Sequence, residues 1–270
     1  MEITVVGMGN MGIAFAKRAA AQGFKVYWWN RTREKVRDAP GTPLAKLSEA
    51  KGLVVVFVAD DDALFAVAPE LGGDYIALAG TYSIDAVKRA MDTLSARGKK
   101  AFAMPVVGSP KNVEGGDAIY IIGAPEDLYE RLRETLEKFG VLFYVGDNVK
   151  AAALKLAYNS FLISTVAVLG EALTLARRYG IGHDIFKKLL EQTVFKEVAS
   201  RYVDRIVGAA KPTFTVRNAA KDMRYAALAA GNAEAGNVAI SGVKALYEIL
   251  TAMGLGEEDY AKAGVLETRK

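Results

Sequence analysis

A glycine-rich loop near the start of the chain is the first run of residues whose types and spacing could do chemistry. It comprises Gly7, Met8, Gly9, Asn10, Met11 and Gly12 and fits the pattern GxGxxG. The loop follows a strand-like run and opens a helix-like one, the context in which this pattern binds a dinucleotide pyrophosphate. Gly7 allows the tight turn, Gly9 lets the backbone approach the phosphates, and Gly12 lets helix and strand pack closely. Because a helix N-terminus attracts negative charge, we expect a dinucleotide site here; a loop that needs glycine only for turning is the alternative.

The residues after the second strand-like run indicate which dinucleotide is preferred. The run is followed by Asn30, Arg31, Thr32 and Arg33, with Lys35 close by. A site for NAD(H) usually carries Asp or Glu here, which binds the ribose 2′-hydroxyl. This chain has Asn30 instead, and a guanidinium such as that of Arg31 can form paired hydrogen bonds with a 2′-phosphate. The sequence therefore predicts NADP(H) as the cofactor, with an ordinary solvated basic turn as the alternative.

Lys155 and Asn159 lie four residues apart in an apolar segment, so both project from one face of a helix. The chain has no cysteine and a single histidine, His183, whose place between Gly182 and Asp184 favours helix capping. An enzyme that reduces a carbonyl needs a proton donor, and lysine, tyrosine and carboxylic acids are then the candidates. From spacing alone, Lys155 either extends to solvent or lies in a pocket that lowers its pKa. The residues leave both possibilities open.

The elements that must position these residues alternate up to about residue 146. β-Branched runs predict strands at 3–6, 24–29, 53–58, 75–79, 100–106, 118–122 and 141–145, and amphipathic stretches between them predict helices at 11–22, 84–97 and 126–139. Only helical stretches follow, at 150–179, 184–193, 196–208, 216–230, 238–253 and 257–266. The predicted class is α/β, an N-terminal Rossmann doubly wound parallel sheet followed by an all-α C-terminal domain.

The same pattern predicts the domain organisation. We expect residues 1–150 to form an NADP-binding Rossmann domain and residues 151–270 an all-helical substrate and dimerisation domain, joined through a long interdomain helix. The alanine-rich, apolar stretch 219–235 favours a homodimer or homotetramer over a self-contained helical bundle.

Composition limits the other classes of partner. The net charge of +4 is mild and the basic residues are dispersed, so nucleic acid is not an expected partner. No apolar run reaches the roughly 20 residues of a membrane span, and the first residues do not read as a secretory signal. The absence of cysteine excludes a thiolate nucleophile and a cysteine-based zinc site, and no metal is expected. We therefore expect a cytoplasmic protein with a small-molecule carboxylate or carbonyl substrate.

Several motifs, separated along the chain and in the same order, resemble the β-hydroxyacid dehydrogenase family. This family includes 3-hydroxyisobutyrate dehydrogenases and glyoxylate and succinic semialdehyde reductases. The resemblance covers nearly the whole chain. It is carried by the glycine loop with Met11, the turn Asn30-Arg31-Thr32, the pair Lys155 and Asn159, Glu171-Ala172-Leu173, and Lys221-Asp222 after Phe214.

The resemblance implies a role for each matching residue. Lys155 would be the general acid in reduction and the general base in oxidation, and Asn159 would orient the substrate. Lys221 would lie over the closed nicotinamide site, and Thr81 would lie beside the nicotinamide ribose. The remaining implied positions are Ala59 and Asp60 on the turn after the third strand, and a substrate-binding loop at 104–109 that includes Val107, Gly108 and Ser109.

The chain departs from the family pattern at several of these positions. Val107 replaces the serine whose hydroxyl and amide help to hold the substrate carboxylate. The amides of Gly108 and Ser109 could still bind a carboxylate, and the Ser109 hydroxyl could substitute for the missing one. Gly80 stands where a serine is more usual, and Val149 and Ala151 stand where glycines are common. These departures leave the identity of the substrate open.

The resemblance predicts an NADP-dependent oxidoreductase that transfers hydride between the nicotinamide and a small 3-hydroxy acid or its semialdehyde or 2-oxo acid. An imine reductase-like enzyme that reduces C=N is one alternative, although imine reductases generally lack a lysine at the position of Lys155. A non-catalytic NADP(H)-binding module is the other, against which the retained Lys155, Asn159 and Lys221 weigh. The direction of the reaction in the cell stays open.

Overall fold

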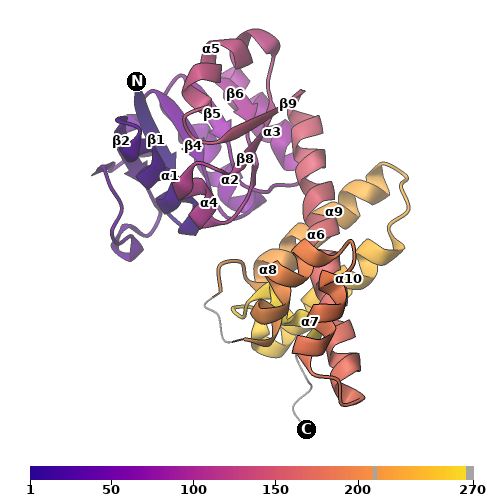
Figure 1. Ribbon diagram of the computed structural model, residues 1–270. Coiled ribbons are helices and arrows are strands. Elements are labelled where there is room, and N and C mark those ends of the chain that lie inside the picture. Colours follow the sequence, from indigo (N-terminus) through magenta and orange to yellow (C-terminus); the bar gives the residue numbers. More distant parts are fainter. Residues whose placement is uncertain (209–211, 266–270) are drawn as a thin grey trace. The chain divides into compact units, whose positions relative to one another are not determined.

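The computed structural model describes residues 1–208 and 212–265 (Figure 1). Its first part contains one β-sheet, whose strands are β1 Glu2–Val6, β2 Lys25–Trp29, β3 Thr42–Pro43, β4 Leu53–Val56, β5 Tyr75–Leu78, β6 Lys100–Ala103, β7 Val106–Val107, β8 Ile119–Gly123 and β9 Val141–Gly146. The strands lie in the order β3-β2-β1-β4-β5-β6-β8-β7, with β9 paired to β8. The pairs from β3 to β6 are parallel, and the order reverses at β1, so the predicted α/β Rossmann class is confirmed.

One side of the sheet is mixed, although the sequence predicts parallel strands throughout. Strand β8 pairs antiparallel with both β6 and β7. The reason is the short helix α4, Pro110–Gly115, whose six residues span only about 9 Å and do not return the chain across the sheet. The predicted strand 100–106 is also split into β6 and β7, because Pro105 has no N–H to donate to a strand ladder.

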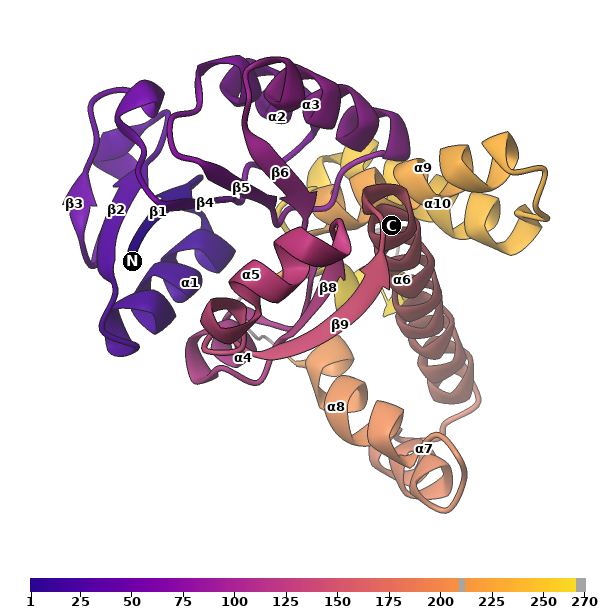
Figure 2. The ribbon, with the colours of Figure 1, turned by 90° about the horizontal axis from the view of Figure 1, so that it is seen from above.

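Helices cover both faces of the sheet, as alternating strand residues require. Helices α1 Asn10–Ala21, α4 and α5 Glu126–Leu136 lie on one face, and α2 Asp61–Val67 and α3 Ile84–Ala96 lie on the other (Figure 2). Ile3 and Val5 of β1 belong to the core under α1 and α5. Val54 and Val56 of β4 belong to the core under α2 and α3. Both faces of the parallel strands are therefore buried.

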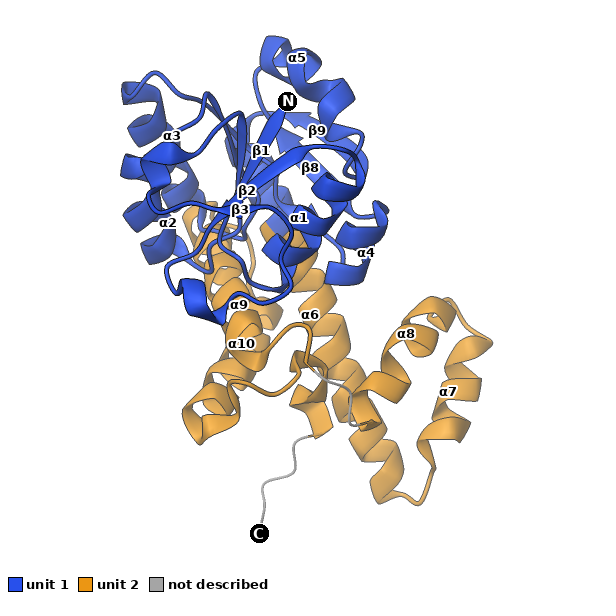
Figure 3. Cartoon of the chain, turned by 90° about the vertical axis from the view of Figure 1, so that its left-hand side faces the viewer, with its two compact units in different colours: residues 1–155 blue, residues 156–270 orange. Residues whose placement is uncertain are grey.

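Helix α6, Asn148–Arg178, follows the sheet and is the long helix that the sequence predicts at 150–179. The chain divides into two units within it, residues 1–155 and residues 156–270 (Figure 3). The described part of the second unit is helical, with α7 His183–Glu191, α8 Lys196–Val207, α9 Val216–Asn232 and α10 Val238–Leu250. Its own core joins apolar residues of α6, α8, α9 and α10.

The end of the second unit differs from the predicted helix over 257–266. Residues Tyr260–Val265 form a 3₁₀ segment, and Leu266 lies outside the described residues. The segment before it pairs with the backbone ahead of α9, because Tyr260 N–H donates to the Phe214 carbonyl and Val216 N–H to the Glu258 carbonyl. Glycines permit close packing nearby, since a Cβ at Gly264 would lie 2.5 Å from the Ala167 carbonyl oxygen of α6. Tertiary pairing therefore overrides the local helical pattern.

Two helical stretches among the described residues are long and apolar enough to cross a membrane, by length and composition alone. The first is Asn148–Arg178, with a mean hydropathy of 1.5, and half of its apolar window is buried inside the protein. The second is Val238–Leu255, with a mean hydropathy of 1.4 and 11% of its window buried. A core helix passes the same test, so the expectation of no membrane partner stays a prediction.

Candidate active site

The glycine loop connects β1 to α1, and its geometry fits a dinucleotide pyrophosphate. Gly7 has φ +93°, and a Cβ there would lie 2.8 Å from the Phe57 backbone. A Cβ at Gly12 would lie 2.0 Å from the Gly7 carbonyl oxygen, whereas a Cβ at Gly9 would meet nothing within 4 Å. Gly9 also begins α1 without a side-chain cap, and the first turn of α1 has no acidic residue. The loop thus leaves backbone N–H groups and open space at a helix N-terminus, as phosphate binding requires.

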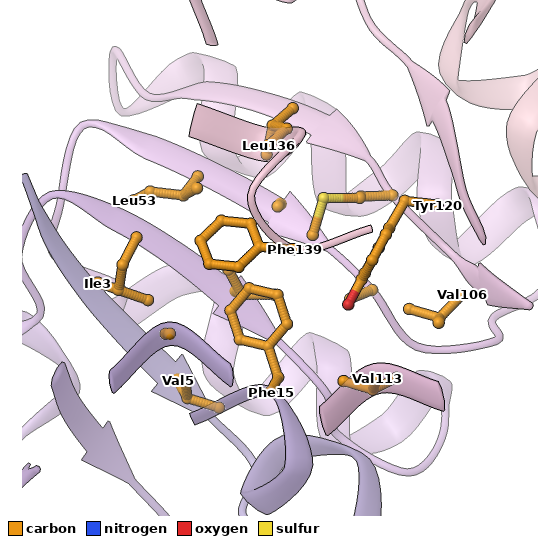
Figure 4. Packing of buried hydrophobic residues seen from close by; sticks show 14 of the residues in the cluster. Ile3, Val5, Phe15, Leu53, Val106, Val113, Tyr120, Leu136 and Phe139 are labelled. Carbon is orange, nitrogen blue, oxygen red and sulfur yellow. The ribbon is translucent and has the colours of Figure 1, made fainter. Parts of the chain in front are cut away.

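Aromatic packing fixes α1 beneath this loop. Phe15 of α1 is fully buried, and its ring centroid lies 4.6 Å from that of Phe139 and 5.5 Å from that of Phe57. Phe15 and Phe139 lie together in the core beside Ile3 and Val5 of β1 (Figure 4). The direction in which α1 presents its N-terminus is therefore set by the core.

Asn30 joins the glycine loop to the turn after β2. The Met8 N–H donates to Asn30 Oδ1 over 3.0 Å, and Asn30 Nδ2 donates to the Thr32 carbonyl over 2.9 Å. The Gly7 N–H donates to the Trp29 carbonyl, also at 2.9 Å. The two segments that sequence analysis assigns to the cofactor are thus held together. Arg31 and Arg33, which follow Asn30 on this turn, are exposed.

Two further turns of the same edge are tied together. The turn of Ala59 and Asp60 follows β4, and the Asp60 carboxylate accepts a backbone N–H of α2 at 2.9 Å. The next residue, Asp61, accepts the Ser83 N–H at 3.0 Å. Ser83 caps α3 and closes the turn after β5 that carries Thr81. Because parallel strands end at one edge, these turns and the glycine loop share that edge of the sheet.

Lys155 lines a pocket at this edge, in the first unit. Its side chain is buried, with 8% exposed, and the pocket's other polar side chains are those of Thr81 and Tyr82. Apolar residues of β5, α3, β6 and α6 complete the lining, together with Gly80 and Pro105. The structure places the Lys155 side chain in a pocket and not in solvent, and its part in catalysis stays a prediction. A buried lysine in a pocket of this kind can exchange a proton with a bound carbonyl or hydroxyl group.

The start of α6 is anchored so that Lys155 faces this pocket. The Asp147 carboxylate accepts the Lys150 N–H at 2.8 Å, and this backbone hydrogen bond is the main cause that lowers the pKa of Asp147. Asn148 Oδ1 accepts the Ala103 N–H at 2.7 Å. The first turn of α6 is therefore fixed to the end of β6, two turns before Lys155.

The predicted substrate loop, residues 104–109, contains the short strand β7 and ends at Ser109, which precedes α4. Val107 packs in a cluster with Ala151 of α6. Gly108 is exposed and has φ +146°, which requires glycine. Ser109 donates its N–H and its hydroxyl to Asn112 Oδ1, at 2.9 and 2.6 Å. Both Ser109 donors are thus engaged in capping α4, and a Ser109 hydroxyl that replaced the family serine would have to leave this cap.

Asn159 and Lys221 share a buried carboxylate in the second unit. Asn159 Nδ2 donates to one oxygen of Asp222 at 2.6 Å, and Lys221 Nζ lies 2.9 Å from the other oxygen. Asn159 is 6% exposed and Asp222 2% exposed. Because the carboxylate accepts from the amide nitrogen, it fixes which way the Asn159 amide is turned. Asp222 therefore links Asn159 and Lys221, two residues that the sequence predicts for the site.

Comparison with known families identifies the chain. Residues 2–146 match the model of the NAD binding domain of 6-phosphogluconate dehydrogenase. Residues 150–265 match the model described as the NAD-binding of NADP-dependent 3-hydroxyisobutyrate dehydrogenase. The chain belongs to the β-hydroxyacid dehydrogenase family. It is an oxidoreductase of that family with a nicotinamide cofactor, which confirms the resemblance read from the sequence.

Two relatives of this β-hydroxyacid dehydrogenase span most of its length. The chloroplastic glyoxylate/succinic semialdehyde reductase 2 of Arabidopsis thaliana is 25% identical over 100% of this chain and 80% of its own. The mitochondrial 3-hydroxyisobutyrate dehydrogenase of Drosophila melanogaster is 26% identical over 96% of this chain and 87% of its own.

Two solved structures share its fold. A 3-hydroxyisobutyrate dehydrogenase from Salmonella typhimurium superposes with a TM-score of 0.85 at 19% identity, over 99% of this chain and 100% of the other. An imine reductase from Pseudomonas sp. superposes with a TM-score of 0.66 at 21% identity, over 97% of each chain. At these identities the likeness concerns the fold alone.

Two residues of this β-hydroxyacid dehydrogenase, Asp222 and Tyr82, lie beside sequence-predicted site residues of their own units, and sequence reasoning gave neither of them a role. Asp222 is the acidic member of the buried face of α9, at helical spacing from Ala219 and Ala226, and that spacing could have revealed it. Tyr82 lines the Lys155 pocket, and only its neighbour Thr81 signals this in the sequence. Among the described residues, no group of three or more His, Cys, Asp or Glu could hold a metal ion.

Proposed function

We propose that this protein is an NADPH-dependent reductase of a small carbonyl substrate that carries a carboxylate, with Lys155 as the proton donor. The observation that carries the proposal is the Lys155 pocket, which lies at the edge where β5 and β6 end. The turns expected to hold a dinucleotide lie at the same edge of the sheet. A cofactor held by the glycine loop and a proton held by Lys155 would thus serve one substrate.

The nicotinamide supplies hydride to the carbonyl carbon when the cofactor is bound. Lys155 then has to hold its proton close to the carbonyl oxygen, where negative charge develops, and donate it. In the opposite direction the neutral amine would accept the proton of the alcohol. Asp222 holds the Asn159 amide in place, and Asn159 stays a predicted substrate-orienting residue on the strength of the family likeness. Lys221 stays a predicted cofactor-side residue on the strength of the family likeness.

The preference for NADP(H) rests on the turn after β2. Its Asn30 side chain offers an amide where a carboxylate would repel a 2′-phosphate, and Arg31 and Arg33 are exposed beside it. The family model that matches residues 150–265 is described as that of an NADP-dependent enzyme, and one solved structure with the same fold is a complex with NADP⁺. Both descriptions support the same preference.

Replacing Arg31 with alanine is expected to raise the Michaelis constant for NADPH by about 10- to 100-fold, the value of a charge-assisted hydrogen-bond pair. The Michaelis constant for NADH should change little, because NADH has no 2′-phosphate. The measurement is steady-state kinetics with each cofactor. Arg37→Ala, an exposed arginine in the same segment, is the matched control for general loss of positive charge. Equal effects of Arg31→Ala on both cofactors would contradict the assignment.

The substrate class is tested with a panel under NADPH. Glyoxylate, succinic semialdehyde and methylmalonate semialdehyde represent the proposed class, with 3-hydroxyisobutyrate and serine under NADP⁺ for the reverse direction. A cyclic imine represents C=N reduction. We expect the carbonyl substrates of the panel, all of which carry a carboxylate, to have a higher kcat/KM than the imine, because Lys155 can supply the proton that the carbonyl oxygen takes up. A panel in which only the imine is reduced would favour the rival activity.

We propose a cytoplasmic homo-oligomer in which a second copy of the chain covers part of the second unit. Exposed apolar residues recur every seven positions along α6, at Phe161, Val168 and Leu175, and therefore lie on one helix face. The stretch Val238–Leu255 is also mostly unburied, and a second copy would cover such surface without a lipid partner. Sedimentation should give a dimer or tetramer at micromolar concentration, and a monomer throughout would contradict the proposal.

A further inference from the structure

Gly80 and Tyr82 form one packing unit in the wall of the Lys155 pocket. A Cβ at Gly80 would lie 2.4 Å from both Cζ and the hydroxyl oxygen of Tyr82. The backbone at Gly80 is not in the left-handed region, so the position needs glycine for space and not for conformation. The tyrosine ring therefore occupies the volume that a side chain at position 80 would take.

Tyr82 cannot easily give up this place. It is 2% exposed, and its hydroxyl donates to the Val58 carbonyl at 3.1 Å. Val58 directly precedes Ala59 and Asp60, the turn expected to pass the cofactor. The ring is thus clamped between the turn after β4 and the turn after β5, both of which belong to the first unit. The Tyr82 ring therefore has a fixed position in the lining of the pocket.

The wall faces the group that is expected to react. Tyr82 and Gly80 line the same pocket as Lys155 and Thr81. The remaining residues that line it are apolar. We propose that Tyr82, in the space that Gly80 leaves open, sets the size limit of the substrate group that the Lys155 pocket admits. The enzyme then takes short carbonyl substrates and excludes longer ones. This inference rests on the proposed function.

Straight-chain 2-oxo acids of two to five carbons are the probes for the first experiment. For the native enzyme, kcat/KM with NADPH should fall as the chain lengthens. Tyr82→Val should raise the ratio of kcat/KM for the five-carbon acid to that for the two-carbon acid by about tenfold or more, the usual value of methylene discrimination. Tyr82→Phe keeps the ring and should keep the native length profile. Tyr82→Leu serves as a second variant if the valine protein does not fold. An unchanged length profile in the folded valine or leucine variant would overturn the inference.

A thermal-unfolding cycle tests the packing without any turnover. Gly80→Ala should lower Tm by roughly 3–8 °C while Tyr82 is present, because the added Cβ overpacks the ring. The same change should have little effect in the Tyr82→Val background, since the ring is gone. An equal loss in both backgrounds would overturn the coupling between the two residues.

Binding separates this inference from the proposed function. If the native protein reduces no carbonyl, the proposed function fails, and the size limit is then measured with unreactive carboxylates from acetate to pentanoate. Their stabilisation of the NADP⁺-bound protein against heat should stop at the shorter members for the native chain and extend to the longer members for Tyr82→Val. Identical ranges for both proteins would overturn the size limit by itself.

Discussion

Lys155→Ala is expected to lower kcat for carbonyl reduction by about 10²- to 10⁴-fold, the usual contribution of a positioned general acid. Lys155 is the lysine of the pocket that also contains Thr81 and Tyr82. Alanine removes its amine, and the Tyr82 hydroxyl there already donates to the Val58 carbonyl at 3.1 Å. Binding of NADPH should persist, because the glycine loop and the Asn30 turn are held by other elements. Steady-state kinetics gives the loss of turnover, and fluorescence titration gives the retained affinity.

Lys150→Ala is the matched control for this variant. Lys150 lies on the same helix, is exposed, and pairs with Asp147 at its surface. Its removal should change kcat by less than about twofold, since surface ion pairs contribute little. Undiminished turnover in Lys155→Ala, or an equal loss in the two lysine variants, would contradict the role given to Lys155.

Asp259→Ala is expected to lower the free energy of unfolding by about 3 kcal/mol, because it leaves the partly buried charge of Arg205 without its partner. Asp259 is 1% exposed, and its oxygens accept from Arg205 Nε at 3.1 Å and from a terminal guanidinium nitrogen at 2.8 Å. Burial lowers the pKa of Arg205, but the hydrogen bonds and charge of Asp259 raise it by more. A raised basic pKa stabilises the fold at all pH below the ordinary arginine value, so the loss should not vary with pH near neutrality.

Chemical denaturation at several pH values measures this loss. Asp204→Ala is the matched control, because Asp204 is an exposed carboxylate whose pair with Lys187 should contribute at most about 1 kcal/mol. Replacing Arg205 and Asp259 together by leucine should recover much of the stability, since no charge is then left unpaired. A loss of the same size in Asp204→Ala would show that the burial of Asp259 is not what matters.

The residues that could be predicted from the sequence are those whose reasons are local. The loop from Gly7 to Gly12 was predictable because its turn, phosphate approach and helix packing need glycine within six residues. Most strands of the first unit and its longer helices α1, α3 and α5 follow from periodic burial in the same way. The short elements β3, α2 and α4 have no counterpart among the predicted runs. The coupling of Asn30 to Met8 is not local, yet the choice of Asn over a carboxylate already signals the cofactor that we propose.

The features that escaped prediction depend on partners far along the chain. In place of the predicted helix over 257–266, a 3₁₀ segment begins only at Tyr260, because Asp259 turns inward to Arg205, 54 positions earlier. Asp222 gains its role only by meeting Asn159, 63 positions away. Tyr82 needs both Gly80 and the Val58 carbonyl to become a pocket wall. The secondary-structure propensity of single residues contains no information about such long-range contacts.

We propose that the nicotinamide cofactor is NADPH and that it is consumed at the Lys155 pocket. The most direct measurement follows cofactor absorbance after a carboxylate-bearing aldehyde such as succinic semialdehyde or glyoxylate is added to the native protein, with NADPH and NADH in parallel. We expect saturable oxidation of NADPH, with a higher kcat/KM than for NADH. Tight binding of NADPH with no oxidation across the carbonyl panel would contradict it and would leave a non-catalytic NADPH-binding module.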